Sequence, residues 1–303
     1  MDLRPLRKFL PKKLLRYERV LNLHKQRGIG ARLIAKELND ISVPVAQRYI
    51  NNRSRPYKNI PPWILEDELH GSQRDALLLN VAGTLSDFTR LIKGYTITFT
   101  TSSICLAVPV YMAQSILGLQ RATSLALDEY QYRYKGNLHR TNEIKIVLCC
   151  HIMATLCRKI YEEPTVLFQC LDEEELAKLI KFAFAFDGSI TANPLAAQII
   201  ITYSERAHIL KFFKEVLTDY FGIDCRIHPS KRRYLALSIW RKNDVEKFCD
   251  KIGIFGWKGV KLEDCVNHRI AARKVVIPEH YVFKGKRMGW VPMEVATLYD
   301  VLK

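Results

Sequence analysis

The sequence contains no apolar run long enough to cross a lipid bilayer. Its longest apolar runs, residues 104–113 and 146–157, fall short of the roughly 20 residues of a transmembrane helix, and Pro109 and His151 interrupt them. The basic N-terminus also lacks the apolar core of a secretory signal peptide. We therefore expect a cytoplasmic protein without a membrane partner.

Cysteine patterns typical of disulfide frameworks or zinc sites are missing as well. The eight cysteines include no C-x-x-C motif, and no group of Cys and His residues has the spacing of zinc ligands. Free thiols in a reducing compartment are the simplest interpretation.

Acidic residues are scarce relative to basic ones, and the imbalance is uneven along the chain. There are 31 Asp and Glu against 47 Lys and Arg, a formal charge of +16. Residues 1–60 hold 15 basic and 4 acidic residues, a net of +11, whereas residues 61–172 have a net of −1 and residues 173–303 a net of +6. This distribution favours a nucleic acid partner and a nucleoid-associated location over a merely soluble basic protein or a membrane surface.

Apolar spacing in the N-terminal part predicts three short helices, at residues 14–26, 29–38 and 43–52. Their lengths and the tight turn before the third are typical of a helix-turn-helix, although small three-helix bundles without a DNA partner share the pattern. The expected contacts with the major groove and the phosphates are, in chain order, Gln47, Arg48, Asn51, Asn52, Arg53 and Arg55. A basic arm is expected at residues 1–13 and a linker at 53–71.

A second helix signal, at residues 173–186, ends in an unusual way. Asp172 and Glu175 form the capping-box pattern at its start, and Asp187-Gly188 follows its last apolar residue. A carboxylate at the C-terminal end of a helix opposes the helix dipole. A bound cation would explain this placement better than helix stability does.

The same pattern occurs about a hundred residues earlier, which indicates an internal repeat. Ser72 precedes Asp87 by 15 residues, as Asp172 precedes Asp187. Three further pairs follow in order: Thr98 with Thr202, Gly118 with Gly222, and Arg140 with Arg241. We expect each repeat, residues 72–171 and 172–255, to run helix, strand, strand, helix, strand, strand, helix, before an extension at 256–303.

In each repeat the fourth predicted strand alternates basic and aromatic residues. The two segments are 130–140 (YQYRYKGNLHR) and 231–242 (KRRYLALSIWRK). A curved antiparallel sheet with such a face can lie in a DNA groove, although an ordinary hairpin surface would look similar. The candidate contacts are Arg133, Lys135, Arg232, Arg233 and Arg241.

Together, the repeat, the helix ending in Asp-Gly and the element order resemble the LAGLIDADG homing-endonuclease family in its single-chain form, over about residues 72–255. The second motif, 182–190 (FAFAFDGSI), matches better than the first, 81–89 (VAGTLSDFT), which has Phe88 in place of glycine. The resemblance implies an α+β fold with two αββαββα repeats about a pseudo-twofold axis, in a monomer, after a small all-α helix-turn-helix domain.

The resemblance also implies the chemistry of the site. Asp87 and Asp187 would meet at the tips of two adjacent helices and share Mg²⁺, because two close carboxylates repel each other unless cations lie between them. Lys242 would be the basic residue near the second site, and its counterpart in the first repeat would be Thr141. The predicted function is therefore a magnesium-dependent endonuclease specific for a site in double-stranded DNA.

Two other functions compete with this one. The first is a non-cleaving transcriptional regulator similar to the bacterial WhiA proteins, which join an inactive LAGLIDADG scaffold to a helix-turn-helix. The departures at Phe88, Phe182 and Thr141 favour it. The second is an RNA splicing maturase, against which the helix-turn-helix pattern argues. We favour the nuclease narrowly, because both acids are in register.

Overall fold

The computed structural model describes residues 1–253 and two short later segments, 283–284 and 287–288. Within the first range, the exceptions are residues 54, 58, 87–88, 91–94, 102–103, 135–136, 193–194 and 231–232. In parts of several strands and of α5, notably 127–134 and 137–143, only the backbone is described. Most of the predicted extension at 256–303 therefore lies outside the described residues.

The N-terminal elements are η1 (Arg4–Phe9), α1 (Lys12–Arg27), α2 (Ala31–Leu38), α3 (Val43–Ile50) and η2 (Pro62–Leu65). Next come α4 (Gly71–Leu85), β1 (Thr89–Arg90), β2 (Thr96–Thr101), α5 (Ile104–Ile116), η3 (Gln120–Ala122), β3 (Thr123–Tyr134), β4 (Asn137–Cys149) and α6 (His151–Glu162). After η4 (Pro164–Val166) and α7 (Leu167–Cys170) the chain forms α8 (Glu173–Asp187), β5 (Ser189–Ala192), β6 (Leu195–Tyr203), η5 (Ser204–Arg206), α9 (Ala207–Glu215), the π-helical turn η6 (Val216–Tyr220), β7 (Arg226–Pro229), β8 (Tyr234–Ile239) and α10 (Lys242–Lys251). The last short strands are β9 (Phe283–Lys284) and β10 (Arg287–Met288).

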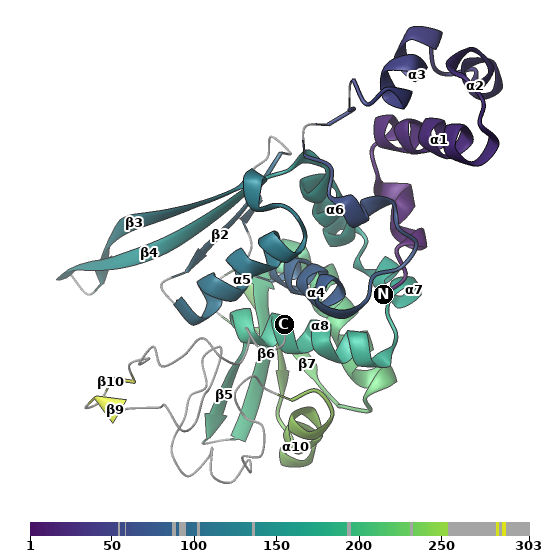
Figure 1. Cartoon of the computed structure of the whole chain (residues 1–303). Helices are drawn as coiled ribbons and strands as arrows, with labels where there is room; N and C mark the ends of the chain where they lie inside the picture. The colour runs from purple at the N-terminus through teal and green to yellow at the C-terminus, as the bar shows by residue number, and fades with distance from the viewer. Residues whose placement is uncertain are drawn as a thin grey trace.

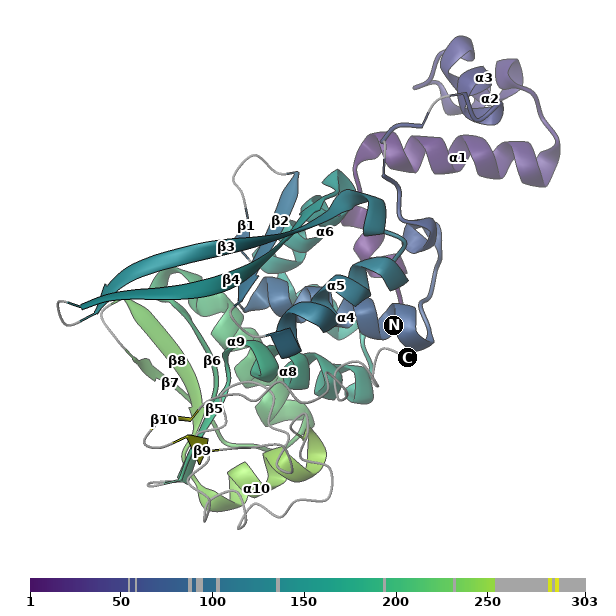
Figure 2. The same ribbon diagram turned by 60° about the vertical axis from the view of Figure 1, so that its left-hand side comes forward.

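Two four-stranded antiparallel sheets, with the same strand order, form the frame of the described chain. The first sheet has the order β1-β2-β4-β3 and the second has β5-β6-β8-β7. Helix α5 packs on the first sheet and α9 on the second, while the β3–β4 hairpin extends away from the body (Figures 1 and 2). A mixed helix-and-sheet class with small antiparallel sheets, as predicted, is confirmed. In the part of the chain described, no helix is long and apolar enough to span a membrane.

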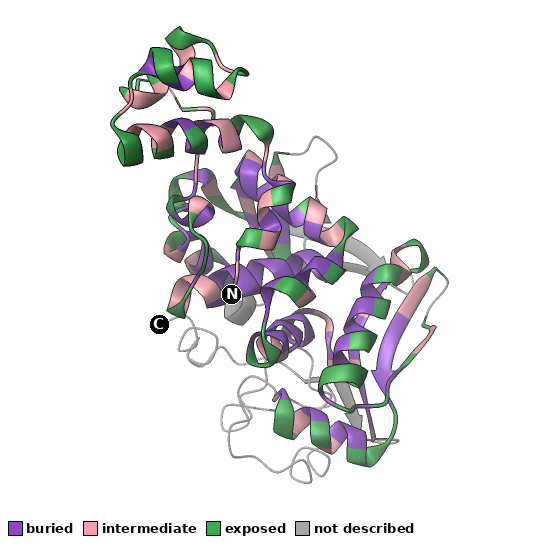
Figure 3. Cartoon of the chain, turned by 90° about the vertical axis from the view of Figure 1, so that its right-hand side faces the viewer, coloured by how far each residue is buried: buried purple, intermediate pink, exposed green. Residues whose placement is uncertain are grey.

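Helices α4 and α8 pack against each other at the centre of the molecule (Figures 1 and 3). Every residue of α4 from Asp75 to Leu85 is buried, because the helix has apolar or small residues on nearly all sides. In α8, Phe186 packs edge-on against Phe99 of the first sheet, with ring centroids 5.4 Å apart. Phe184 contacts Phe248 of α10 at 5.3 Å. One helix of the second half thus joins both halves in a single core.

Charged groups link the starts of these two helices. Lys178 on α8 lies 3.3 Å from each carboxylate oxygen of Asp75 on α4, and Arg74 contacts the same carboxylate at 2.9 Å. The predicted capping box is present: the Glu175 N–H donates to Asp172 Oδ1 at 2.8 Å and the Asp172 N–H to Glu175 Oε2 at 3.2 Å. Because Asp75 is buried, these partners compensate a carboxylate that water does not reach.

A small core of its own holds the N-terminal helices together. Buried Val20, Ala31, Ile34 and Ala46 bring α1, α2 and α3 into contact. The other end of α1 belongs to the main core through Leu14 and Tyr17. Helix α1 is therefore shared between the N-terminal three-helix unit and the body, and the unit projects from the body at the end of this helix (Figure 2).

Four sequence-based expectations were wrong. Residues 1–13 do not form an extended arm. They contain the short helix η1, and they bury four apolar side chains against the body, namely Leu3, Leu6, Phe9 and Leu10. Helix α4 begins at Gly71 after His70, so Ser72 is not its cap. Residues 143–149 continue strand β4, because alternate residues Ile144, Ile146 and Leu148 face the core. Arg140 therefore lies within a strand, whereas Arg241 caps a helix.

The motif glycine at the end of α8 has a steric role that can be tested. A Cβ atom on Gly188 would lie 2.2 Å from Phe184 Cδ2 and 2.5 Å from the Phe184 carbonyl oxygen. We expect Gly188→Ala to lower the free energy of unfolding by about 1–3 kcal/mol, because a buried ring and a backbone must move. Urea unfolding measures this. Gly30→Ala is the matched control, since a Cβ there meets nothing within 4 Å, and equal effects of the two variants would contradict the steric explanation.

Candidate nucleic-acid interface

The exposed surface of α3 carries the residues predicted to contact DNA. The inward face of this helix is held by Ala46, which is fully buried, and by Tyr49, whose ring meets Tyr17 edge-on at 5.0 Å. The opposite face and the segment after it are solvent-exposed at all six predicted positions, Gln47, Arg48, Asn51, Asn52, Arg53 and Arg55. All six are therefore accessible on α3 and the segment that follows it.

Hydrogen bonds within this surface orient its polar groups. Gln47 Nε2 donates to Asn51 Oδ1 at 3.0 Å, and Arg55 Nε donates to Asn52 Oδ1 at 3.2 Å. Side-chain amides and guanidinium groups are the groups that bond adenine and guanine in pairs in the major groove. An adjacent pair of amides, already aligned, is therefore suited to reading base edges.

The positive charge of this surface is not compensated by neighbouring acids. Among the described residues, no carboxylate lies within 4.0 Å of a basic group of Arg48, Arg53 or Arg55. Two other arginines of the three-helix unit are paired, Arg16 with Asp40 at 2.6 Å and Arg27 with Glu37 at 2.9 Å, whereas exposed Arg19 and Arg32 have no carboxylate partner among the described residues. The α3 surface and the segment after it therefore carry uncompensated positive charge, which is the kind of group that binds phosphates.

A polar row crosses the second sheet on the face that points away from α9, which we call the outer face. Its register positions are Ser189, Gln198, Ser238 and Arg226, one on each strand. Directly opposed side chains in an antiparallel sheet lie about 5 Å apart. Because Ser189 is two residues beyond Asp187, the end of α8 leads directly into this row.

Aromatic and basic groups adjoin that row. His228 Nε2 lies 2.9 Å from the Ser238 hydroxyl, and the His228 ring meets the Trp240 ring at 5.2 Å. Trp240 is 50% exposed and Arg226 is exposed. Sequence reasoning missed these residues and Gln198. The available signal was the alternation in Arg226–Pro229, where Ile227 packs inward between two outward residues.

The remaining predicted DNA contacts divide into described and undescribed residues. Arg233 is exposed just before β8. Arg241 lies 3.4 Å from Asp224, and Lys242, which is 64% exposed, lies 3.6 Å from Glu246. These are surface ion pairs, which a phosphate can displace at little cost. The side chains of the others are not described. For Arg133 the structure describes the backbone alone, and Lys135 and Arg232 lie outside the described residues.

The row that corresponds in the first sheet has different chemistry. It also begins two residues beyond the motif acid, and its register positions are Thr89, Thr98, Val147 and Ser124. Thr98 therefore corresponds to Gln198, not to Thr202 as the sequence alignment suggested, because strand pairing overrides local similarity. Small or apolar residues stand in the first sheet where Gln198, Ser238 and Arg226 stand in the second.

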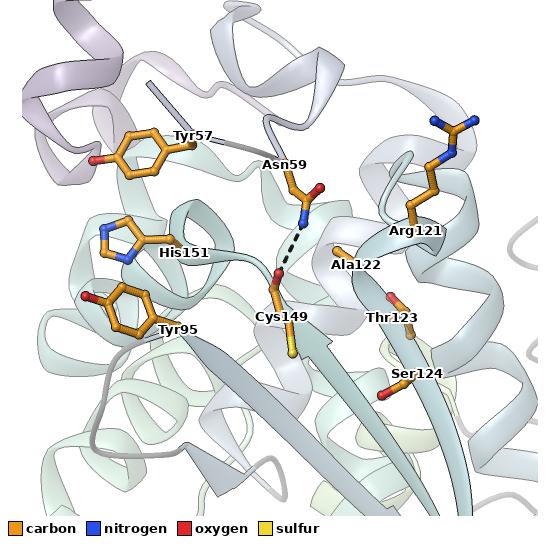
Figure 4. A pocket seen from close by; sticks show the side chains of 9 residues that line it. All are labelled: Tyr57, Asn59, Tyr95, Arg121, Ala122, Thr123, Ser124, Cys149 and His151. Carbon is orange, nitrogen blue, oxygen red and sulfur yellow. Dashed lines mark hydrogen bonds between the residues drawn. The ribbon is translucent and has the colours of Figure 1, made fainter. Parts of the chain in front are cut away.

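The counterpart of Lys242 also differs from the sequence expectation. Lys242 is the first residue of α10, and the first residue of α6 is His151, whereas Thr141 lies within β4. The His151 ring is sandwiched between Tyr57 at 5.0 Å and Tyr95 at 4.9 Å (Figure 4). Burial, and after it the charge of Arg158, lowers the pKa of His151. The first half therefore presents a stacked neutral ring where the second presents an ammonium group.

The two motif helices end differently. In α8 the helical bonding continues to the Gly188 N–H, which donates to the Phe184 carbonyl at 2.7 Å, and half-buried Asp187 is the last helical residue. Helix α4 ends at Leu85, and the Ser86 N–H donates to the Ala82 carbonyl at 3.0 Å, while residues 87 and 88 lie outside the described residues. Helix α4 therefore ends two residues earlier relative to its motif acid. Asp87 itself lies outside the described residues.

The described residues contain neither a metal site nor a reactive thiol among Cys170, Cys225 and Cys249. Of the two predicted magnesium ligands only Asp187 is described, and in the described parts of the chain no three His, Cys, Asp or Glu side chains form a group that could hold a metal ion. Burial raises the pKa of Cys170, Cys225 and Cys249 to about 12, so these free thiols stay protonated. The magnesium site stays a prediction.

Comparison with known proteins gives structural similarities at low identity. No protein-family model matches the sequence, and no curated protein matches it. The crystal structure of full-length DUF199/WhiA from Thermatoga maritima is 18% identical, with a TM-score of 0.45, over 69% of this chain and 64% of that one. The N-terminal LAGLIDADG domain of DUF199/WhiA gives 17% and 0.45, over 66% and 89%. The homing endonuclease I-WcaI bound to its DNA recognition sequence gives 14% and 0.42, over 61% and 83%. This chain thus spans less than two thirds of full-length DUF199/WhiA, and similarity at this level assigns no function.

The stacked histidine predicts a pH-dependent contribution to stability. Because the pKa of His151 is lowered in the folded chain, the unfolded chain binds the proton more readily, and stability is lost as the pH falls through the ordinary histidine pKa of about 6.5. We expect His151→Phe, which keeps a ring in the stack, to lose less stability than wild type between pH 8 and pH 5.5. Urea unfolding across this range is the measurement, with His70→Gln, at a position whose side chain is 79% exposed, as the control. Parallel pH profiles for His151→Phe and wild type would show that the loss of stability at low pH does not come from His151.

Proposed function

We propose that this chain is a monomeric, sequence-specific double-stranded DNA-binding protein. In this proposal the N-terminal three-helix unit is a helix-turn-helix with α3 as its recognition helix, and the body consists of two LAGLIDADG-type repeats about a pseudo-twofold axis. The identical strand orders of the two sheets and the packing of α4 against α8 support the repeat. The four-residue turn between α2 and α3 supports the helix-turn-helix.

The observation that carries the proposal is the exposed surface of α3. It combines an aligned pair of amides, Gln47 and Asn51, with arginines that have no carboxylate partner among the described residues. Base edges are read by such amides, and phosphates are bound by such arginines. The net charge of +11 over residues 1–60 adds long-range attraction to a polyanion.

We further propose that the chain acts as a regulator and does not cut both DNA strands. Three differences between the halves support this: the early end of α4, the Thr98–Val147–Ser124 row in the first sheet, and the stacked ring of His151. Hydrolysis of two strands needs equivalent groups at two positions. In the first half, Thr98 and His151 occupy the positions that correspond to Gln198 and Lys242 of the second half. The α3 surface does not include these groups.

A second candidate is the magnesium-dependent endonuclease of the homing type that the sequence predicts. One observation favours it: Asp187 ends α8 beside a polar row that contains Gln198 and Arg226. In this candidate Asp87 and Asp187 would hold Mg²⁺, which activates water and stabilises the leaving oxygen when it is bound. Lys242 would lie near the second site.

Cleavage separates the two candidates. A duplex selected by the protein from a random library should be bound tightly and left intact on both strands in Mg²⁺ or Mn²⁺, and Asp187→Asn should bind it as wild type does. Gel mobility and denaturing gels give the two readouts. Metal-dependent double-strand cleavage that Asp187→Asn abolishes would establish the nuclease instead.

The recognition surface predicts two distinct mutational signatures. Asn51→Ala should weaken binding of the selected duplex by about 1–3 kcal/mol and relax the preference at one base pair. Arg53→Gln should weaken binding of all duplexes alike and lower the salt slope of log K by about 1, because one phosphate contact is lost. Fluorescence anisotropy at several salt concentrations measures both.

Arg27→Gln is the matched control for these variants. It removes the same charge from the three-helix unit, but Arg27 lies at the end of α1 and is paired with Glu37. It should keep both the base preference and the salt slope. If Arg53→Gln kept the salt slope of wild type, the proposed contact of the segment after α3 with DNA phosphates would be wrong.

A further inference from the structure

A groove of about 520 Å³ lies where the segment after α3 meets the edge of the first sheet (Figure 4). Its lining comes from the segment after α3, from the start of α6 and from the first sheet with the residues that flank its strands. Its size falls within the range of sites that hold one small organic ligand. The lining residues are Tyr57, Asn59, Tyr95, Arg121, Ala122, Thr123, Ser124, Cys149 and His151.

One wall of the groove is a stack of three rings. His151 is nearly parallel to Tyr57, at an interplanar angle of 18°, and lies at 36° to Tyr95 (Figure 4). Tyr95 is 60% exposed although one of its faces is against His151. The outer ring therefore contacts His151 and still leaves apolar surface in water. Rigid, exposed aromatic rings are the surfaces on which unpaired bases stack.

The rest of the groove supplies polar groups. Arg121 is exposed, and among the described residues it has no carboxylate within ion-pair distance. The Ser124 side chain is also exposed, and the Asn59 side chain lies across the groove, where its amide donates to the Cys149 carbonyl at 3.3 Å. His151 Nδ1 is buried without a hydrogen-bond partner. A ligand with an aromatic ring and an anionic group matches this combination of an exposed ring and a guanidinium.

We propose that this groove binds one unpaired nucleotide of the bound DNA, with its base stacked on Tyr95 and its phosphate toward Arg121. The inference rests on the proposed DNA-binding function and adds a contact that neither the α3 surface nor the sheet faces supply. A base inside an intact duplex has no free face for Tyr95, so the nucleotide must be out of the helix. An unpaired or mismatched base is the easiest to bring there, because its unstacking costs least.

The test compares two duplexes that differ only in one bulged nucleotide. The bulge carries 2-aminopurine, whose fluorescence falls when it stacks on a ring. We expect full-length wild type to bind the bulged duplex about tenfold more tightly than the fully paired one and to quench the probe, as stacking of a single base predicts. Tyr95→Ala should lose both the preference and the quenching, whereas Tyr95→Phe should keep them.

Two controls make the outcomes distinct. Tyr111→Ala removes an exposed tyrosine that does not line the groove and should behave as wild type. Arg121→Gln should weaken the preference for the bulge without abolishing quenching. Equal affinity for the two duplexes, or a preference that survives Tyr95→Ala, overturns the inference and leaves the proposed function standing. Failure to bind either duplex overturns both.

Discussion

The packing of α4 against α8 is the constraint on which the rest of this structure depends. Both helices are buried along most of their length, so neither could be stable in water alone, and each sheet is positioned by the helix that leads into it. The contact of Lys178 with Asp75 joins the helices at their starts. A buried charge is costly without its partner, so this pair favours one relative alignment of the two helices. That alignment also fixes where the strand that follows each helix begins, and so how the two sheets are placed relative to the shared core.

On this shared frame the two halves have diverged in chemistry while keeping the same strand order. The second sheet keeps Gln198 and Arg226 in line with the end of α8, whereas the first sheet has Thr98 and Ser124 at those register positions. Strand order follows from core packing, which tolerates such exchanges on the outer face. The same strand order therefore accommodates different side chains on the outer faces of the two sheets.

Sequence reasoning predicted most elements of the second half and all three N-terminal helices, because their apolar spacing and caps are local signals. The capping box of Asp172 and Glu175 is an example. Sequence reasoning mistook the end of β4 for the start of a helix, because residues 144–149 are apolar except for Lys145 and lead directly into α6, so that their strand structure appears only once the pairing with β2 is known. The exposed α3 residues could be predicted from helical periodicity. The Tyr57–His151–Tyr95 stack could not, since its members come from three separate segments.

The sharing of α1 between two cores has a geometric consequence for any target site. Leu14 and Tyr17 anchor one end of this helix in the body, while Val20 anchors the three-helix unit farther along it, and Tyr57 ties the returning chain to α6. A straight helix behaves as a rod and not as a flexible tether. In the proposed DNA complex, the number of base pairs between the segment at α3 and the segment at the sheets is then set by the protein, and inserting half a turn of DNA, about 5 base pairs, would turn one segment to the far side of the duplex.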